Sequence, residues 1–163
     1  MMEANHGEPD LLQLRYRGEP WKLLVCCILL NRTRRSQGVD RVAEELFRRW
    51  PTPRTLADAP PLPLVRLLTP LGFQRRRALS LRRFAEDWTW LGALYQGTTP
   101  AASTELRAMH GVGDYAFDAY RLLVLGDLSV PPRDKELLRW WRWRMTSLSK
   151  GDPREAGMVR GYV

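Results

Sequence analysis

Hydrophobic residues recur along this chain at helical spacing, and the alternating patterns typical of strands are almost absent. Pro20 opens the apolar run WKLLVCCILL, and proline is tolerated at the first position of a helix. The segment VDRVAEELFRRW puts Val42, Leu46 and Phe47 on an apolar face, puts charged residues on the opposite face, and stops before Pro51. Both segments are predicted helices, the first buried and the second amphipathic.

Later segments repeat this pattern. The stretch RRRALSLRRFAEDWTWLGAL, residues 75–94, is predicted to form one long amphipathic helix, and Gly-Thr-Thr-Pro at 97–100 a loop. Pro132 begins a last helix, RDKELLRWWRWRM, and the sequence after it has little periodicity. We therefore expect an all-α domain of about eight short helices in residues 1–145, followed by a partly disordered tail, 146–163.

Charge points to the kind of partner. The 163 residues carry a formal net charge of +8, and nearly all of the positive groups are arginines, because lysine occurs only at Lys22, Lys135 and Lys150. Arginine matches the geometry of phosphate groups better than lysine does. A chain this basic favours a polyanionic partner such as nucleic acid.

The residue types that hold metals and cross-links are scarce. The two cysteines, Cys26 and Cys27, are adjacent in an apolar run, and the only histidines are His6 and His110. This argues against a disulfide framework, a zinc knuckle and a four-cysteine iron–sulfur cluster. No apolar run reaches transmembrane length, and the N-terminus is polar, so we expect no membrane partner and an intracellular location.

The most informative segment is LRAMHGVGDYAFDAY, residues 106–120. It predicts two helices joined by a tight turn at Gly111, Val112 and Gly113. Such a hairpin brings backbone N–H groups and a helix N-terminus close to a phosphate. Asp134 follows further along the chain, in VPPRDKELL. A carboxylate held near that phosphate can act on whatever the phosphate carries.

This hairpin and its downstream aspartate resemble the helix-hairpin-helix DNA glycosylase superfamily, most closely its thymine-mismatch branch. Four segments are similar to that branch and occur in the same order: PWKLLVCCILLNRT (20–33), LLTPLGFQRRRA (67–78), MHGVGDYAFDAYR (109–121) and PPRDKELLRWW (131–141). The resemblance implies a two-lobed all-α fold with a central cleft. It also implies a cytoplasmic or nucleoid-associated base excision repair enzyme, acting as a monomer on double-stranded DNA without an iron–sulfur cofactor. The substrate would be a thymine- or uracil-type base, for instance opposite guanine.

The resemblance also assigns site residues. Asp134 falls on the catalytic aspartate of the family. Tyr115 takes the position where bifunctional relatives have a nucleophilic lysine, which implies base removal without strand cleavage. Gln13 falls on a base-reading glutamine. Arg32 falls on an arginine that enters the vacated DNA stack, and Phe73 on an apolar wedge that is usually leucine.

The hairpin is implied to bind the DNA backbone through Gly111, Val112 and Gly113. By the same family pattern, the backbone carbonyls of Arg107, Met109 and Val112 hold a monovalent or calcium-like ion that bridges to a phosphate.

Three arginines and one lysine near these positions need their own interpretation. Arg75, Arg76 and Arg77 most simply form a solvated helix start, and phosphate contact, with Arg75 as the named candidate, is the alternative. Lys135 adjoins Asp134 and raises the alternative of an imine-forming lyase. Neighbouring helical residues point about 100° apart, so we expect Lys135 to miss the pocket.

Two acidic residues depart from the branch. Asp114 puts a negative charge inside the hairpin, where the phosphate is expected, and Glu136 stands where a relative has lysine. Both are expected to weaken DNA contact locally.

Each assigned role has a plainer alternative. Asp134 can serve only as a helix cap, favoured by the helix dipole. Gln13 and Arg32 can be solvated, and Tyr115 and Phe73 can be core residues. For the whole protein, the alternatives are an enzyme of the same scaffold that modifies thymine derivatives in DNA, and a non-catalytic hairpin module that only binds DNA.

Overall fold

The computed structural model describes residues 7–95 and 103–151. Within these ranges it contains helices and no strand, so the predicted all-α class is confirmed. The α-helices are α1 Pro20–Leu30, α2 Val39–Arg49, α3 Pro53–Ala57, α4 Pro61–Leu68, α5 Gln74–Tyr95, α6 Ser103–Ala108, α7 Asp114–Leu123 and α8 Lys135–Ser149. The 3₁₀ helices are η1 Leu12–Tyr16, η2 Arg35–Gln37 and η3 Thr69–Leu71.

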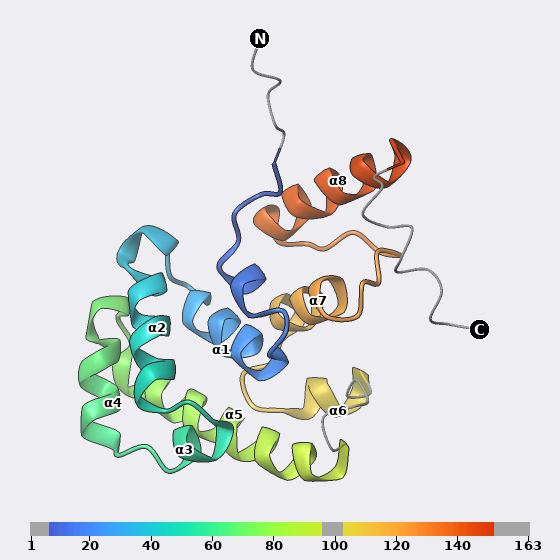
Figure 1. The fold of residues 1–163 in the computed structure, drawn as a ribbon. Coiled ribbons are helices and arrows are strands. Elements are labelled where there is room, and N and C mark those ends of the chain that lie inside the picture. Colours follow the sequence, from blue (N-terminus) through green and yellow to red (C-terminus); the bar gives the residue numbers. More distant parts are fainter. Residues whose placement is uncertain (1–6, 96–102, 152–163) are drawn as a thin grey trace.

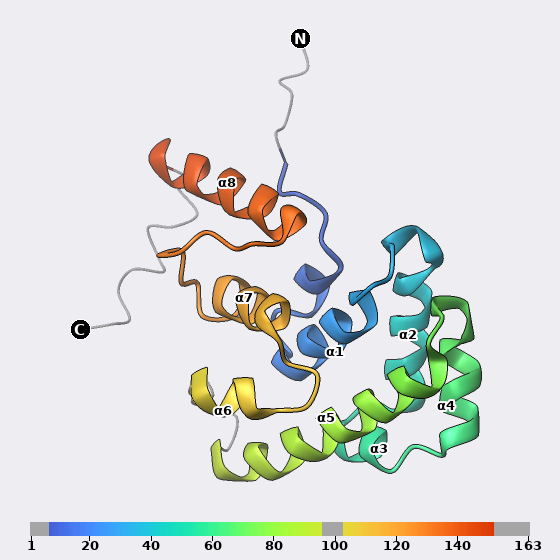
Figure 2. The ribbon, with the colours of Figure 1, turned by 180° about the vertical axis from the view of Figure 1, so that it is seen from behind.

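The helices form two lobes that meet at α1 (Figure 1). One lobe contains α2, α3, α4 and α5, and the other contains α7, α8 and the N-terminal segment with η1. The opposite view also places α1 between the lobes (Figure 2). Helix α1 packs against η1, α2, α5 and α7, so it belongs to the core of both lobes.

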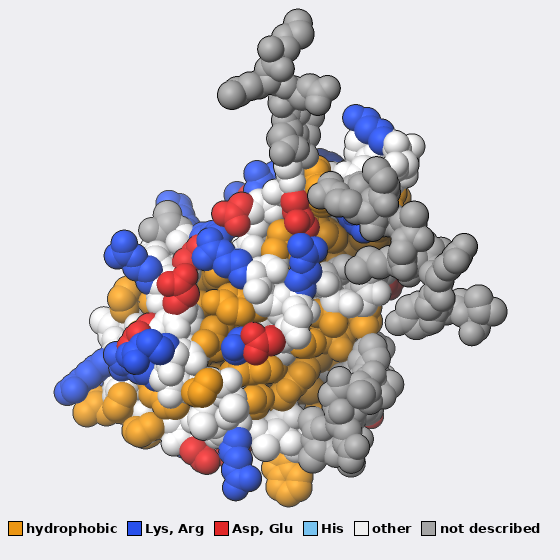
Figure 3. Space-filling view, in the orientation of Figure 1, with side chains coloured by type: hydrophobic (Ala, Val, Ile, Leu, Met, Phe, Trp, Pro, Cys, Tyr) orange, Lys and Arg blue, Asp and Glu red, His pale blue; other side chains and the backbone are white. Residues whose placement is uncertain are grey.

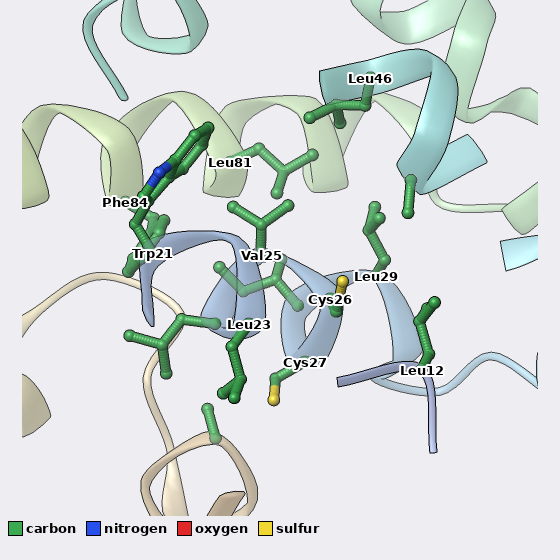
Figure 4. Packing of buried hydrophobic residues seen from close by; sticks show 14 of the residues in the cluster. Leu12, Trp21, Leu23, Val25, Cys26, Cys27, Leu29, Leu46, Leu81 and Phe84 are labelled. Carbon is green, nitrogen blue, oxygen red and sulfur yellow. The ribbon is translucent and has the colours of Figure 1, made fainter. Parts of the chain in front are cut away.

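Burial of α1 on all sides explains its uninterrupted apolar sequence. Its residues Leu23, Leu24, Val25 and Leu29 are fully buried. Val25 points toward Leu81 of α5, whereas Leu23 points to the opposite side of α1 (Figure 4). The predicted burial of the two cysteines is confirmed, since Cys26 and Cys27 lie in the same cluster. A helix packed this way is a rigid base for the segments that leave its two ends.

The long helix predicted over 75–94 is α5, and it begins one residue earlier, at Gln74. Leu81, Phe84 and Ala85 form its buried face, as their spacing predicts. The loop predicted at 97–100 lies outside the described residues.

Helix α8 continues beyond Met145, its predicted end, and stops at Ser149. The hydroxyl of Thr146 donates to the carbonyl of Arg142 at 2.9 Å, and that of Ser147 donates to the carbonyl of Trp143 at 3.0 Å. Hydroxyl residues bonded back in this way fit a helix although they give no apolar period. The first residues of the expected tail are therefore helical, and the tail from 152 onward lies outside the described residues.

Charged side chains of both signs share the surface. On the face drawn in Figure 3, Lys and Arg side chains are interspersed with Asp and Glu, and apolar side chains are exposed between them. The net positive charge is therefore not gathered into one patch on this face. No helix in the described ranges is both long and apolar enough to cross a bilayer.

Candidate active site

A pocket of about 680 Å³ lies where η1, the end of α1 and the starts of α7 and α8 meet. This volume is within the range of small-ligand pockets. Gln13, Tyr115 and Asp134 all line it, so three residues predicted from distant segments come together. We call it the Gln13 pocket. Its other lining residues are Asp10, Leu11, Leu12, Leu30, Asn31, Arg32, Thr33, Arg34, Arg35, Lys135, Glu136 and Arg139.

Gln13 is buried in the wall of this pocket, with 2% of its surface exposed. Its amide nitrogen Nε2 donates to the hydroxyl of Tyr115 at 2.5 Å and lies 3.9 Å from the sulfur of Cys27. Neither contact uses the amide oxygen Oε1. No fully buried side-chain oxygen in the described residues lacks a hydrogen-bond partner, so Oε1 is accessible from the pocket. The alternative of a solvated Gln13 is wrong.

Burial keeps the groups around Gln13 neutral. It raises the pKa of the Tyr115 phenol well above its usual range, with Cys27 and the Asp134 carboxylate adding to the shift. Burial also raises the pKa of Cys27 to about 12. At physiological pH Tyr115 therefore keeps its proton while its oxygen accepts from Gln13. That proton is available as a donor toward a ligand in the pocket.

Asp134 is the N-cap of α8, and the helix begins at Lys135 instead of directly after Pro132. Both capping bonds go to one oxygen: Oδ1 accepts from the backbone N–H of Glu136 at 2.9 Å and of Leu137 at 3.0 Å. The predicted capping role is thus present, and it fixes the carboxylate on the pocket wall. The second oxygen, Oδ2, accepts no hydrogen bond from the described residues, so capping and chemistry at this aspartate are compatible.

Lys135 also lines the Gln13 pocket, contrary to the expectation that it would miss it. That expectation assumed two consecutive helical residues. Asp134 has extended backbone angles, φ −66° and ψ 136°, and only Lys135 is helical, so the angle of about 100° between helical neighbours does not apply.

A smaller pocket of about 240 Å³ adjoins the first. Asn31 and Arg32 line both pockets and therefore form their shared wall. We call the smaller one the Phe73 pocket; its other lining residues are Ile28, Phe73, Arg76, Arg77, Ser80 and Gly111. Phe73 is 63% exposed, so the alternative of a core phenylalanine is wrong. Arg32 is exposed as well.

Arg32 and Phe73 also share a backbone feature. Their φ angles are +58° and +48°, and among the described residues they are the only non-glycine residues with positive φ. A side chain in the left-handed region costs conformational energy, which persists only where the surroundings enforce it. Two such residues line the same pocket, so the surrounding structure holds both sides of it in a specific conformation.

The three arginines after Phe73 have different environments. Arg75 is exposed and is not among the lining residues of either pocket, whereas Arg76 lines the Phe73 pocket. Arg77 is buried, which corrects the interpretation of all three as a solvated helix start. Only the third arginine lies on the core-facing side of α5, beside Ala78. The sequence does contain a signal for this, because Arg77 lies four residues before Leu81, one turn earlier on the buried face of the helix.

The helix-hairpin-helix turn joins α6 to α7. Gly111 has φ +81°, and a Cβ there would lie 3.0 Å from the Ile28 side chain, so this position requires glycine. Gly113, the N-cap of α7, has extended backbone and nothing within 4 Å of a Cβ position. The fold itself therefore does not demand glycine at Gly113, and the turn is open there.

The carboxylate of Asp114 forms ion pairs with two arginines. Its Oδ1 lies 2.7 Å from the guanidinium of Arg107, and its Oδ2 lies 3.3 Å from that of Arg133. These bonds and charges hold the pKa of Asp114 below its usual range. The Asp114 carboxylate, at the start of α7, thus links α6 through Arg107 to Arg133, the residue that precedes Asp134.

The carbonyls predicted to hold a cation belong to the same turn. Arg107 lies in the last turn of α6, where backbone carbonyls find no N–H donor within the helix. The carbonyl of Met109 accepts a hydrogen bond from the backbone N–H of Val112 at 3.2 Å. Carbonyl oxygens suit hard cations such as Ca²⁺. The donor set fits an ion, and the site stays a prediction. No cluster of three or more His, Cys, Asp or Glu suited to a metal occurs in the described residues.

The arrangement of the helices has a counterpart among solved structures. The chain is similar to the structure of a thermostable thymine-DNA glycosylase, with a TM-score of 0.65 and 22% identity over 77% of this chain and 56% of that one. The fold is therefore the two-lobed fold of the helix-hairpin-helix DNA glycosylases.

Sequence relatives narrow the class. The chain is 35% identical to a thymine/uracil-DNA glycosylase of Pyrobaculum aerophilum and to a thymine-DNA glycosylase of Aeropyrum pernix, over 82% of its length in each case. It is 32% identical to a methyl-CpG-binding domain protein 4-like protein of Arabidopsis thaliana, over 81% of its length and 27% of that protein. No family model matches. These similarities relate the chain to the helix-hairpin-helix DNA glycosylases of the thymine branch, and it spans 55% and 57% of the two archaeal relatives.

Proposed function

We propose that the protein is a monofunctional DNA glycosylase. It flips a thymine- or uracil-type base, such as one mispaired with guanine, out of double-stranded DNA and hydrolyses its N-glycosidic bond as the first step of base excision repair. The observation that carries this proposal is the joint lining of one pocket by Gln13, Tyr115 and Asp134. We infer that it acts as a monomer on nucleoid DNA.

The proposed chemistry depends on Asp134. Breaking an N-glycosidic bond develops positive charge on the deoxyribose, as in glycoside hydrolysis. A carboxylate beside C1′ stabilises that charge and orients the water that adds to C1′ as the base leaves. The capping bonds hold Oδ1, so Oδ2 is the oxygen that faces the sugar.

Base recognition is assigned to Gln13 and Tyr115. The accessible Oε1 of Gln13 suits the N3–H of thymine or uracil, a donor that cytosine lacks at this position. The protonated Tyr115 hydroxyl adds a donor suited to a pyrimidine carbonyl. Their mutual hydrogen bond fixes the orientation of both groups before the base arrives.

The Phe73 pocket accounts for base flipping. Extrusion of a base costs a few kcal/mol of stacking and pairing energy, less at a mismatch. Phe73 and Arg32, which are exposed and both line this pocket, are suited to fill the gap in the stack. The wall that Asn31 and Arg32 form between the two pockets would set the target base on one side and the remaining stack on the other.

The hairpin supplies the backbone grip. The open turn at Gly113 leaves the amides at the N-terminus of α7 accessible to a phosphate. The carbonyls of Arg107, Met109 and Val112 are proposed to hold a cation, whose positive charge would bridge to the same phosphate. Exposed Arg75 is proposed as a further phosphate contact.

One observation favours a second activity. Lys135 lines the Gln13 pocket, so its amine has access to the sugar. An imine between this amine and C1′ of the sugar would lead to strand cleavage, which the monofunctional proposal excludes. Tyr115 stands at the family position of the nucleophilic lysine and favours hydrolysis.

The decisive experiment compares the wild type with Asp134→Asn on labelled duplexes containing G·T, G·U, A·U or 5-hydroxymethyluracil pairs. Alkali converts each abasic site into a strand break. Asparagine is as good an N-cap as aspartate, so the variant keeps the start of α8 while it loses the charge. We expect excision by the wild type, with loss of product and retention of DNA binding in the variant.

Three results contradict parts of the proposal. Undiminished excision by Asp134→Asn excludes the mechanism. DNA binding without abasic sites on any duplex indicates a binding module or an enzyme that modifies thymine derivatives. Nicking without alkali, trapped by borohydride and lost in Lys135→Ala, identifies a lyase.

A further inference from the structure

Arg77 is a buried guanidinium bonded to the end of α1. Its Nη1 donates to the carbonyls of Ile28 at 2.9 Å, Leu29 at 3.0 Å and Asn31 at 3.2 Å, and its Nη2 donates to the hydroxyl of Thr33 at 2.8 Å. Only 6% of the residue is exposed. Two of these carbonyls belong to the last turn of α1, where no intrahelical donor is available to them.

The same side chain is bonded to a second segment. Its Nε donates to the carbonyl of Gly72 at 3.3 Å, and Nη2 reaches the carbonyl of Leu71 at 3.5 Å. The backbone N–H of Arg77 donates to the carbonyl of Phe73 at 2.8 Å. One residue therefore fixes the end of α1 and the turn before α5, which are more than forty positions apart in sequence.

The bonds of Arg77 bracket both left-handed residues. Asn31 and Thr33 flank Arg32, and Gly72 directly precedes Phe73. Isolated left-handed conformations of this kind are costly and persist only where the surrounding structure enforces them. A rigid fork of five N–H donors is the side chain best suited to hold several carbonyls in fixed positions at once.

Within the described ranges, the charge of Arg77 has no acidic partner. No carboxylate of the described residues forms an ion pair with it, and burial lowers its pKa. The partial negative charge at the C-terminus of α1 takes the place of a counterion. A buried cation is costly in a fold, so its presence between these two segments requires a reason beyond packing.

We propose that Arg77 is a positioning residue that locks the segments of Arg32 and Phe73 to each other, so that both side chains enter the DNA stack as one unit. This inference rests on the proposed function, which assigns the filling of the gap to those two side chains. It predicts that Arg77 affects the excision rate where a base stack must be opened and has little effect on that rate where the target base is not stacked.

The test uses two substrates with the same target base. One has the base in a duplex mispair, and the other has it in an unpaired three-nucleotide bulge. Displacement of a positioned group by about 1 Å can reduce a rate about 10²-fold, so we expect a loss of that order for Arg77→Met on the duplex in single-turnover assays. On the bulge we expect a change of less than about threefold. A 2-aminopurine beside the target should show the same loss of flipping in the duplex.

The second part of the test asks whether the effects of the substitutions are non-additive. In a background of Arg32→Ala and Phe73→Ala, the further change Arg77→Met should alter duplex excision less than about twofold, because nothing is left for Arg77 to position. A full loss in that background, or an equal loss on both substrates, overturns the inference.

Two further variants separate positioning from folding. Arg77→Lys keeps a charge but offers one amine instead of the fork, and should show the same duplex-selective pattern with a smaller loss. Arg121→Met is the matched control, because Arg121 is also buried and donates to the carbonyls of Asp127 at 2.8 Å and Val130 at 2.7 Å, in the connection that leads to Asp134. It should affect both substrates alike. A wild type inactive on both substrates overturns the proposed function itself, whereas an active wild type with an unselective Arg77→Lys overturns only this inference.

Discussion

The amide nitrogen of Gln13 donates a hydrogen bond to the hydroxyl of Tyr115 at 2.5 Å, across 102 residues of sequence. This bond fixes the glutamine amide with its nitrogen toward the tyrosine, which leaves the amide oxygen for the pocket. The pair ties the segment before α1 to the start of α7, and thereby ties the residues proposed for base recognition to the hairpin. A substitution of either residue should therefore change the orientation of the other side chain.

Tyr115→Phe should weaken both stability and recognition. The variant leaves the Gln13 amide N–H without its acceptor in a buried site, which costs about 1–3 kcal/mol of unfolding free energy. Loss of the fixed amide orientation should lower excision from a G·U duplex by about tenfold or more. Urea unfolding and single-turnover excision measure the two effects. Tyr16→Phe is the control, because Tyr16 packs edge-on against Phe47 outside the pocket, and it should change neither quantity.

The two hairpin glycines should respond differently to alanine. Gly111→Ala forces a side chain into a positive φ and against Ile28, and should destabilise the fold by about 1–3 kcal/mol. Gly113→Ala meets open space, so its stability should stay within about 0.5 kcal/mol of the wild type. Its DNA affinity should fall, since a methyl group intrudes where the phosphate approaches. If Gly113→Ala bound a duplex as tightly as the wild type, the hairpin would not be the backbone contact.

Asp114→Asn should strengthen DNA binding. The carboxylate engages Arg107 and Arg133, and its removal leaves both guanidinium groups available to phosphates. Each added phosphate contact steepens the dependence of log affinity on log salt by about 0.9. Titrations of a labelled duplex at several salt concentrations should show a higher affinity and a slope steeper by one to two such increments. Glu136→Gln is the matched control at the other acidic departure, where only Arg139 is released. An unchanged slope in Asp114→Asn would mean that these arginines do not reach the DNA.

Part of the candidate site can be predicted from local signals. The hairpin is recognisable from two glycines between apolar periods, whereas the role of Asp134 was assigned by the family resemblance, and the predicted helix start at Pro132 placed this residue inside the helix and not at its N-cap. The family resemblance assigned roles to Gln13 and Tyr115, but neither it nor any local pattern predicted the burial of Gln13 or its bond to Tyr115.

Arg77 shows where sequence reasoning fails. Helical spacing places Arg77 on the buried face, but the carbonyls that accept its hydrogen bonds in the core belong to α1 and its end, more than forty positions away. Lys135 shows a second failure, because the angle of about 100° between helical neighbours does not hold between Asp134 and Lys135. Both errors concern the direction of a side chain; the first depends on distant contacts with α1, and the second on the exact residue at which the last helix begins.

Alkaline pH should destabilise the protein through its buried neutral acids. The thiol of Cys27 has its pKa raised to about 12 in the folded state, against an ordinary value of 9.0, and the pKa of Tyr115 is raised above its ordinary 10.0. Above about pH 9 the unfolded chain loses protons that the folded chain keeps, so stability falls as pH rises and is unaffected below that pH. Between about pH 9 and 10.5, Cys27 alone should account for about 1–2 kcal/mol. Urea unfolding of the wild type and of Cys27→Ala at about pH 8 and pH 10.5 measures this loss. The quantity compared is the decrease in unfolding free energy between the two pH values, and not the absolute stability of each protein. The decrease should be smaller in Cys27→Ala and smaller again when Tyr115→Phe is added; equal decreases in all three proteins would show that these groups ionise alike in both states.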